Sequence, residues 1–536
     1  MPTVAQVIVD HLHAAGVRTV FGLPGGETVE ILEALRQAEI RFVLVHNESS
    51  ALFMADAHAR LTGVPGVCLT TLGPGATNAT MGLAHAYLDR APVLLITAQK
   101  PDPLLPDYTH QVVDLQRIFA PITKASYKLG PGNVHRMMDK ALELVRADRP
   151  GPVHLQISNE DAIQQTSPAP HHAPVQTATP PIVPAAEIHE ARGTLAAAKR
   201  PIIVAGLGLE PDAPYAALRA LAESLNAPVI VTPKAKGALS EDHPLFAGTI
   251  GLTRTDPAYA VLNDADCVVA VGFDVVELVL PWQHTAPLIW IAPWENEDPV
   301  VPSVLEFVGP LTPVLEQLAD GDYTSAPDWG ATRVEDFRAA TAPGALPQPA
   351  ANRILPQTVL DGMRRALPAQ TFLAVDVGSH KVHSSLDWSA RHPNRFHLSN
   401  GLSGMSFALP AAIGAALALP DQPAVCLTGD AGLAMVLGEL GILAREQLPV
   451  ICIVLNDGAI DLIRSHQVRV GKPVFGTEFD SPNYAQIAAA FGLPNHRVQS
   501  DSELDTALQS ALEQGGPCLI EVMLDPSSYP TTPKPA

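Results

Sequence analysis

The stretch that decides the fold is Gly429-Asp430-Ala431-Gly432, which follows the apolar run at residues 424–428. A second apolar run, at 450–455, is followed by Asn456-Asp457-Gly458. Residues 433–447, between the two runs, have helical character, so the order strand, turn, helix, strand, turn is predicted. Asp430 and Asp457 would then lie at the carboxyl ends of two parallel strands, the edge at which doubly wound sheets bind ligands.

The residues at this predicted edge suit a magnesium ion and a diphosphate. Asp430, Asp457 and a backbone carbonyl of the second turn, taken as that of Ala459, are hard oxygen donors of the kind that Mg²⁺ prefers. Ala431 and Gly432 are small enough for backbone N–H groups at the helix start to approach phosphate oxygens. Two solvated turn aspartates are the alternative interpretation, since turns favour these residues.

Length and composition indicate a globular protein of several domains. The chain has 536 residues, of which 47% are apolar, and this exceeds what one core supports. A net charge of −21 argues against nucleic acid or an anionic membrane as partner. Apolar runs stop short of the roughly 20 residues of a membrane helix. Five scattered cysteines and an N-terminus without a secretory signal lead us to expect a cytoplasmic protein.

Helical segments alternate with short apolar runs along most of the chain. This alternation predicts α/β domains with mainly parallel sheets. Proline-rich stretches divide the chain and are expected to be linkers. The predicted organisation is three domains at residues 1–163, 186–320 and 351–526, linkers at 164–185 and 321–350, and a loose tail at 527–536.

The two turns resemble the signature of thiamine diphosphate (ThDP) enzymes, Gly-Asp-Gly followed one helix and one strand later by Asn-Asn. Here the signature takes the form Gly429-Asp430-Ala431 and Asn456-Asp457, with alanine for the third glycine and aspartate for the second asparagine. The resemblance covers nearly the whole chain and is closest to acetolactate synthase and its relatives. It implies three doubly wound domains (pyrimidine, middle and diphosphate), ThDP and Mg²⁺ as cofactors, Asp430 and Asp457 as metal ligands, and a homodimer or homotetramer.

The resemblance also implies a role for Glu48, which follows the predicted strand at 42–45. As in the family, this glutamate precedes Asp56 in the run Ala-Asp-Ala-His-Ala-Arg at 55–60. A poorly hydrated carboxylic acid can share a proton with N1′ of the aminopyrimidine, which favours the imino tautomer that deprotonates the thiazolium C2. A first-turn glutamate that only complements the helix dipole is the alternative.

Further cofactor contacts are implied at turns of the first and third domains. By resemblance, Met405 is the bulky residue that bends the cofactor into a V shape, and the Ser403 carbonyl accepts from its 4′-amino group. Ordinary core packing is the alternative for a methionine. The remaining implied contacts lie beside the pyrimidine or the diphosphate: Gly25, Gly26, Asn78, Ser379, His380, Asp430, Ala431, Gly432, Asp457 and Ile460.

Gln111 and His110 are expected to face the substrate. Their segment, 107–114, resembles the acetolactate synthase loop whose glutamine faces the second substrate, with His110 where phenylalanine is usual. The implied reaction is decarboxylation of a 2-oxo acid, with pyruvate as the leading donor, and carboligation to a second carbonyl. Two alternatives stay open: a 2-oxo acid decarboxylase of the benzoylformate decarboxylase type, and a non-catalytic scaffold member of the family.

The middle domain carries a weak dinucleotide-like turn, Gly206-Leu207-Gly208-Leu209. It lacks the third glycine and the acidic residue that such a turn requires. Acetolactate synthases carry FAD in this domain, and their Arg-Phe-Asp-Asp-Arg stretch is represented here by residues 272–276, without either arginine. FAD is therefore a doubtful cofactor for this chain.

Overall fold

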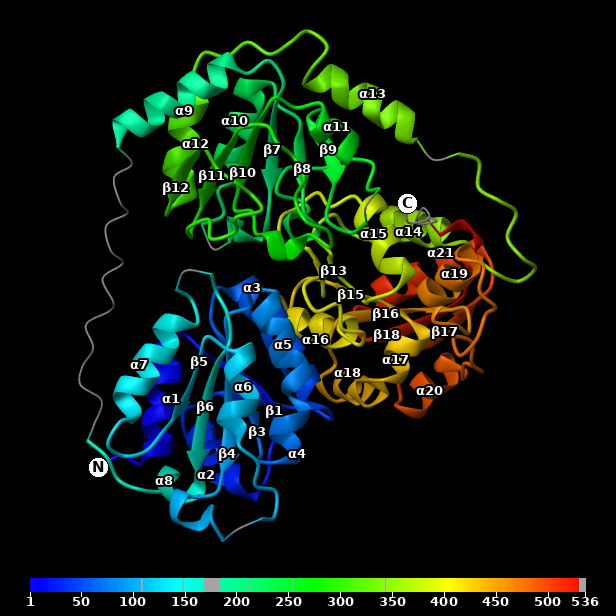
Figure 1. Cartoon of the computed structure of the whole chain (residues 1–536). Helices are drawn as coiled ribbons and strands as arrows, with labels where there is room; N and C mark the ends of the chain where they lie inside the picture. Colours follow the sequence, from blue (N-terminus) through cyan, green and yellow to red (C-terminus); the bar gives the residue numbers. More distant parts are fainter. Residues whose placement is uncertain are drawn as a thin grey trace.

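The computed structural model contains three α/β domains, each built on a six-stranded parallel sheet (Figure 1). The structure describes residues 1–107, 109–147, 149–167, 184–210, 212–253, 255–342 and 344–529. Every pair of neighbouring strands in the three sheets runs parallel. The predicted fold class is confirmed. In the described part of the chain, no helix combines the length and apolarity needed to cross a bilayer.

The first domain has a sheet whose central strands β3, β4 and β6 are buried at every residue, as expected where helices cover both faces. Its strands, in sheet order, are β2 (Arg41–Leu44), β1 (Thr19–Leu23), β3 (Gly66–Thr70), β4 (Val93–Gln99), β6 (Val153–Ser158) and β5 (Ala125–Lys128). Its helices are α1 (Val4–Ala14), α2 (Val29–Gln37), α3 (Glu48–Thr62), α4 (Pro74–Asn78), α5 (Thr80–Leu88), α6 (Leu115–Phe119), α7 (Val134–Leu144) and α8 (Asn159–Ala162).

The middle domain, green in Figure 1, repeats this architecture. Its strands, in sheet order, are β12 (Leu305–Val308), β11 (Leu288–Ala292), β10 (Cys267–Val271), β7 (Pro201–Ala205), β8 (Val229–Val231) and β9 (Phe246–Thr249). Its helices are α9 (Ala185–Ala197), α10 (Tyr215–Leu225), α11 (Tyr259–Asn263), α12 (Leu311–Ala319) and α13 (Ala331–Thr341).

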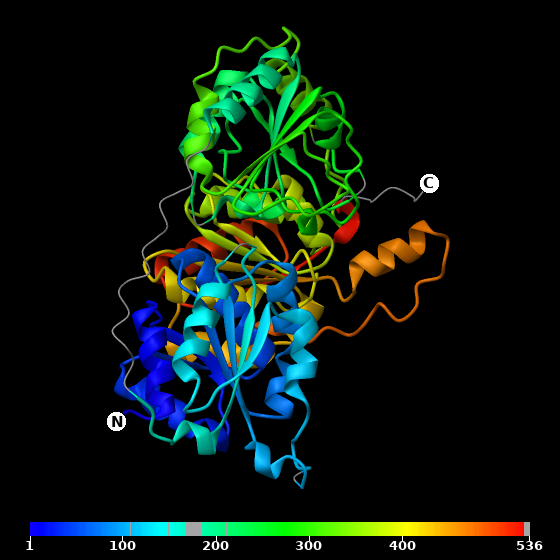
Figure 2. The ribbon, with the colours of Figure 1, turned by 60° about the vertical axis from the view of Figure 1, so that its left-hand side comes forward.

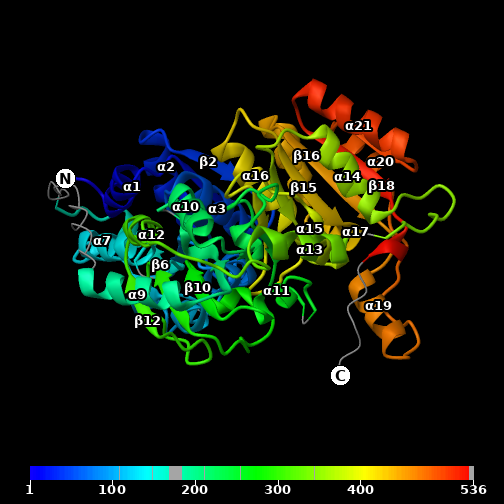
Figure 3. The same ribbon diagram turned by 90° about the horizontal axis from the view of Figure 1, so that it is seen from above.

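The third domain places the helices α14 and α21 on one face of its sheet and α16 on the other (Figure 3). Its strands, in sheet order, are β14 (Phe396–Leu398), β13 (Phe372–Val375), β15 (Ala424–Gly429), β16 (Val450–Asn456), β18 (Cys518–Met523) and β17 (Asn495–Val498). Its helices are α14 (Pro356–Ala366), α15 (Ser379–Asp387), α16 (Ala408–Ala418), α17 (Asp430–Ala434), α18 (Leu440–Glu446), α19 (Asp461–Arg469), α20 (Tyr484–Ala490) and α21 (Asp501–Gln514).

The first and third domains share one hydrophobic core, because α3 packs directly on α16. A Cβ atom at Gly414 would lie 2.3 Å from the carbonyl oxygen of Met54, so glycine is required where the two helices approach most closely. The rings of Phe53 and Phe407 meet edge to face across the same contact, with centroids 5.5 Å apart. The two domains therefore behave as one packed unit.

Three predicted features differ in the structure. The helix predicted at 433–447 is two helices, α17 and α18, because Val436 takes the non-helical angles φ −131° and ψ 28° between them. The stretch 321–350, predicted as a linker, contains α13, whose Phe337 packs on the core of the middle domain. The tail predicted as loose begins with a 3₁₀ turn at Pro526–Ser528, and Tyr529 lines a cavity. Residues 168–183 of the first linker and 530–536 of the tail lie outside the described residues.

Candidate functional site

A cavity of about 190 Å³ lies at the carboxyl ends of β13, β15 and β16 in the third domain. This is the edge predicted from the two turns. The residues that the sequence assigned to the third domain all line it: Ser379, His380, Ser403, Met405, Asp430, Ala431, Gly432, Asp457, Ala459 and Ile460.

Asp430 ties the two turns together. One carboxylate oxygen accepts from the backbone N–H of Ala431 at 2.8 Å, and the other accepts from the N–H of Gly458 at 2.9 Å and from the Ser481 hydroxyl. Its backbone carbonyl accepts from the Tyr484 hydroxyl at 2.7 Å. Burial raises the pKa of this carboxyl. Ser481 and Tyr484 are supporting residues that the sequence did not single out.

Asp457 carries a buried carboxylate oxygen, Oδ2, that has no hydrogen-bond partner among the described residues. Arg464 approaches this oxygen only to 3.5 Å. Burial, with the neighbouring charges of Asp430 and Asp461, raises the pKa of Asp457 to about 7. Closely spaced buried carboxylates and an unpartnered oxygen are what a bound cation would stabilise, so these residues fit Mg²⁺.

The described side chains at this edge of the sheet offer few metal ligands. Among the described residues, no group of three or more His, Cys, Asp or Glu side chains could hold a metal. A metal at Asp430 and Asp457 would therefore need a backbone carbonyl, such as that of Ala459, and ligands from outside the protein. This is the usual arrangement for Mg²⁺, which keeps water and phosphate oxygens in its octahedron.

Met405 lies in a tightly held loop. Ser403 and Ser406 on either side have positive φ angles, of 53° and 75°. The buried carboxylate of Asp376 holds the end of this loop, because it accepts from the backbone N–H groups of Ser406 at 3.0 Å and Phe407 at 3.2 Å. These bonds compensate for backbone conformations that non-glycine residues seldom adopt.

Asp376 was not predicted as a site residue, although it directly follows the strand β13. It also accepts from the Thr428 hydroxyl at 2.9 Å, and burial raises its pKa to about 6. A Cβ atom at Gly432 would lie 2.5 Å from Asp376 Oδ2, so Asp376 explains why the fourth residue of the turn is glycine. A carboxylate at the end of a buried strand was the signal that could have revealed it.

Ser379 and His380 begin α15 at the cavity wall. The Ser379 hydroxyl donates to Asp461 Oδ2 at 2.7 Å, which links this helix to α19. Burial lowers the pKa of His380 to about 4, so the ring is neutral at physiological pH. Its Nε2 atom is buried and has no hydrogen-bond partner in the part of the chain that the structure describes. A neutral imidazole with a free nitrogen can form one hydrogen bond with a bound group.

Glu48 is the first residue of α3 and is buried. The preceding Asn47 caps the helix, since its side chain accepts from the N–H groups of Ser49 and Ser50. The side-chain amide of Asn78 donates to Glu48 Oε2 at 2.5 Å. A Cβ atom at Gly75 would lie 3.1 Å from Glu48 Oε1, so the glycine-rich turn closes over the carboxyl group.

Gln111 lies beside the same turn, and both Gln111 and His110 are exposed. A Cβ atom at Gly73 would lie 2.6 Å from the backbone oxygen of Gln111, and Gln111 itself has a φ of 61°. Gly25 packs against Thr71, which leads into the turn, while Gly26 faces open space. The first domain thus gathers one group of predicted residues around Glu48.

The two groups of predicted residues do not meet within one chain. Of the described residues that line the third-domain cavity, none comes from the first domain. Glu48 and Asn78 therefore do not line the third-domain cavity of their own chain.

The turn at Gly206–Leu209 in the middle domain does not fit a dinucleotide. The N–H of Leu207 donates to the buried Glu277 carboxyl at 2.8 Å, and that of Gly208 donates to the Gly272 carbonyl at 2.7 Å. The Trp294 ring fills the space next to Gly208, where a Cβ atom would lie 2.5 Å from it. The amides that would bind a diphosphate are thus already satisfied inside the protein.

Comparisons with known proteins agree with the fold. Three family models match, described as the N-terminal TPP binding domain, the central domain and the C-terminal TPP binding domain of thiamine pyrophosphate enzymes, where TPP is another name for ThDP. They cover residues 2–118, 188–318 and 376–522. The chain belongs to the family of thiamine pyrophosphate enzymes.

Within this family the chain is acetolactate synthase-like. The acetolactate synthase isozyme 2 large subunit of Escherichia coli K12 is 30% identical over 97% of this chain and 95% of its own length. A probable acetolactate synthase large subunit of Methanococcus aeolicus is 29% identical, over 98% and 92%. A probable 2-ketoarginine decarboxylase of Pseudomonas aeruginosa is 32% identical, over 97% and 94%. Relatives of similar identity thus carry two different activity names.

Proposed function

We propose that the chain is a ThDP- and Mg²⁺-dependent enzyme that decarboxylates a 2-oxo acid and joins the product to a second carbonyl compound. The observation that carries this proposal is the third-domain cavity, where the unpartnered oxygen of Asp457 lies beside Asp430 and Met405. ThDP, when bound, supplies a nucleophilic thiazolium carbon and an electron sink for decarboxylation. Asp430, Asp457 and the Ala459 carbonyl would hold the metal, and Met405 would keep the two rings in the reactive orientation.

Glu48 is proposed to hold the proton that activates the pyrimidine. Its carboxyl group is buried, and the Asn78 amide orients one of its oxygens. Water is kept away by the glycine-rich turn, in which Gly75 lies against the carboxyl group. A proton can then pass between Glu48 and a ring nitrogen without competition from solvent.

The active unit is proposed to be a homodimer, assembled further into a homotetramer, in which Glu48 of one protomer faces the cavity of its partner. This follows from the separation of the two groups of residues in one chain. The segment that contains α19 stands out from the body of the third domain (Figure 2). It exposes Ile463, Val468 and Phe475, with 48%, 63% and 84% of their surfaces accessible, which is typical of a segment that packs against a partner.

Pyruvate is proposed as the donor, with Gln111 as the residue that orients the acceptor. Gln111 is exposed next to the turn that covers Glu48, so its neutral amide can donate to a substrate oxygen without taking up the proton in transfer. His110 is close enough in sequence to contribute a second polar contact. The buried free cysteines support a reducing location such as the cytoplasm.

Decarboxylation of a cationic 2-oxo acid is the second candidate. Asp461 adds a third carboxylate to the cavity, beyond the two proposed metal ligands. It is already bound by the Ser379 hydroxyl at 2.7 Å and by Arg464 at 2.7 Å, so a cationic substrate would have to compete with Arg464. This candidate agrees with the name of the 2-ketoarginine decarboxylase relative.

Product analysis separates these functions. The purified chain, ThDP and MgCl₂ are incubated with pyruvate alone and, separately, with 2-oxo acids that carry a guanidinium group. Acetolactate or acetoin from pyruvate supports the proposal, whereas acetaldehyde alone supports a simple decarboxylase. Turnover of only the guanidinium substrates supports the second candidate. A chain that binds ThDP and turns over none of these substrates would be a scaffold member, and the proposal would be wrong.

A further inference from the structure

We propose that a second cavity, at the junction of the three domains, binds a small anion that carries a phosphate or a pair of carboxylate groups. This cavity measures about 460 Å³. The first domain contributes Arg60, Arg90 and Arg146, the middle domain Glu210 and Trp294, and the third domain Arg395. None of these residues lines the proposed active-site cavity.

The charge on the cavity wall is unusual for this protein. Four guanidinium groups face one carboxylate, that of Glu210, in a chain whose net charge is −21. Arg60 forms an ion pair with Asp56 at 2.6 Å, and Arg90 forms one with Asp274 at 3.0 Å. Because these ion pairs neutralise Arg60 and Arg90, Arg146 and Arg395 supply the positive charge that favours an anionic ligand, against the single carboxylate of Glu210.

Arg146 and Arg395 have no ion pair with any described carboxylate. The exposed Arg146 at the rim donates to the Ala15 carbonyl at 3.4 Å, and the half-buried Arg395 donates to the Asn394 carbonyl at 3.1 Å. Guanidinium groups bind phosphate and carboxylate oxygens through two parallel hydrogen bonds. Two such groups from different domains can hold a ligand with two negative charges.

Two buried donors of residues that line the cavity lack a hydrogen-bond partner within the described residues. They are the Nε atom of Arg395 and the indole N–H of Trp294, and the Trp294 side chain is almost fully buried. Buried donors are nearly always satisfied in folded proteins, because an unmade hydrogen bond is costly. Both atoms have almost no accessible surface, so the two side chains would have to shift for an anion in the cavity to supply the acceptor oxygens. The N–H groups of the turn at Gly206–Leu209 are already bonded, so the ligand depends on the side chains rather than on that turn.

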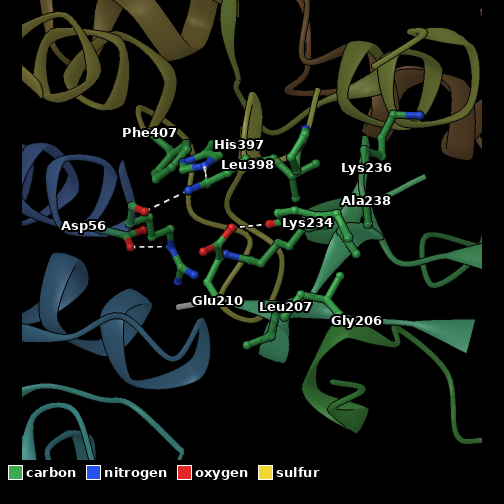
Figure 4. A pocket seen from close by; sticks show the side chains of 16 residues that line it. Asp56, Gly206, Leu207, Glu210, Lys234, Lys236, Ala238, His397, Leu398 and Phe407 are labelled. Atoms are coloured by element: carbon green, nitrogen blue, oxygen red, sulfur yellow. Dashed lines mark hydrogen bonds and ion pairs between the residues drawn. The ribbon is translucent and has the colours of Figure 1, made fainter. Parts of the chain in front are cut away.

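A narrower pocket adjoins this cavity and is shown in Figure 4. It shares Arg60 and Glu210 with the cavity, and Asp56 lies there next to Arg60. The second oxygen of Asp56 is 2.8 Å from His85, which in turn lies 3.0 Å from the Ser399 hydroxyl. Ser399 begins the segment that leads to Met405. An anion bound at Arg60 would thus be linked through Asp56 and His85 to the segment that precedes Met405.

Isothermal titration of the full-length chain, without ThDP or Mg²⁺, tests the proposal independently of the proposed function. The probes are inorganic phosphate and malonate, with sodium chloride at matched ionic strength. We expect phosphate, malonate or both to bind. The double variant Arg146→Gln/Arg395→Gln should bind them at least about tenfold more weakly than the wild type. The matched control is Arg365→Gln, since exposed Arg365 pairs with Asp505 on the surface of the third domain. The control should bind like the wild type.

Each outcome has a meaning. Binding of phosphate alone identifies a phosphorylated ligand, binding of malonate alone a dicarboxylate, and binding of both the shared chemistry. If anion binding changes the tryptophan fluorescence of the wild type, Trp294→Phe should abolish that change, because Trp294 lines the cavity. This result would place the anion in the cavity. The proposal is overturned if neither anion binds beyond the chloride control, or if the double variant binds as tightly as Arg365→Gln does.

Discussion

The ammonium group of Lys381 lies 3.0 Å from the side-chain oxygen of Ser403. Lys381 also donates to the Ser399 carbonyl at 2.9 Å, and it is buried. Burial lowers its pKa to about 8, so the ammonium form persists at neutral pH. One lysine on α15 therefore holds both ends of the segment that precedes Met405.

Removing this lysine should loosen the loop. We predict that Lys381→Met weakens ThDP binding by about tenfold, because two charge-assisted hydrogen bonds are lost. Titration of ThDP at fixed Mg²⁺, followed by tryptophan fluorescence, measures the change. Lys199→Met, at an exposed position in the middle domain, is the control and should bind like the wild type. Equal affinities for the two variants would show that Lys381 does not position the loop.

The unpartnered oxygen of Asp457 predicts a metal requirement. Asp457→Ala should raise the Mg²⁺ concentration needed for half-maximal ThDP binding by about tenfold or more, since one hard ligand is removed. Asp457→Asn should lie between that variant and the wild type, because an amide oxygen can still coordinate the ion. Mg²⁺ titrations in the presence of ThDP give this order, and EDTA should release the cofactor from the wild type. An unchanged Mg²⁺ requirement in Asp457→Ala would contradict the assignment.

Glu48 should affect the reaction rather than cofactor binding. We predict that Glu48→Gln lowers kcat by about 100-fold or more, the usual effect of removing a general acid or base. ThDP affinity should change by no more than a few fold, because the metal and the third-domain residues remain. Steady-state kinetics together with ThDP titration separates the two effects. Activity near that of the wild type would exclude Glu48 as the proton donor.

The proposed dimer can be tested by mixing two inactive variants. Glu48→Gln lacks the acid, whereas Asp430→Ala lacks the metal ligand, and each should be inactive alone. If subunits exchange, a mixed dimer has one site with both defects and one intact site, so an equal mixture should recover about a quarter of the wild-type activity. Activity is measured after unfolding and refolding the mixture. Failure to recover activity, with mixed dimers shown to form by mass spectrometry, would mean that each site belongs to one chain.

Acid should destabilise the first domain through His154. This buried histidine lies between the hydroxyls of Thr97 at 2.8 Å and Ser126 at 2.7 Å, and burial lowers its pKa to about 3. In the unfolded chain His154 takes up a proton near pH 6.5, whereas in the folded chain it stays neutral until about pH 3. The stability that neutral His154 contributes is thus complete above pH 6.5 and is lost as the pH falls toward 3.

This loss should amount to about 1.4 kcal/mol for each pH unit over that range. His154→Gln should unfold at a lower temperature at pH 7 but lose less of its stability on acidification than the wild type. Thermal melts between pH 4 and 7 measure both effects. Parallel pH profiles for the two proteins would show that His154 does not carry this dependence.

The sequence by itself determined the fold class and the place of the candidate site. Buried central strands such as β15 and β16 are continuous apolar runs, and the turns that follow them carry Asp430 and Asp457, so local patterns were sufficient. The edge strands β5, β9, β12, β14 and β17 were not recognised. They are only three or four residues long and three of them, β5, β12 and β17, are partly exposed, so their apolar signal is weak.

Only the tertiary structure decided which distant residues support the site. Asp376 and Ser406 are 30 residues apart, and His85 and Ser399 are 314 apart, yet each pair is in direct contact. It also separated Glu48 from the third-domain cavity and brought four arginines from two domains to one junction. The physical reason is that periodicity reports how a segment folds on itself, whereas these contacts depend on how the packed domains approach one another.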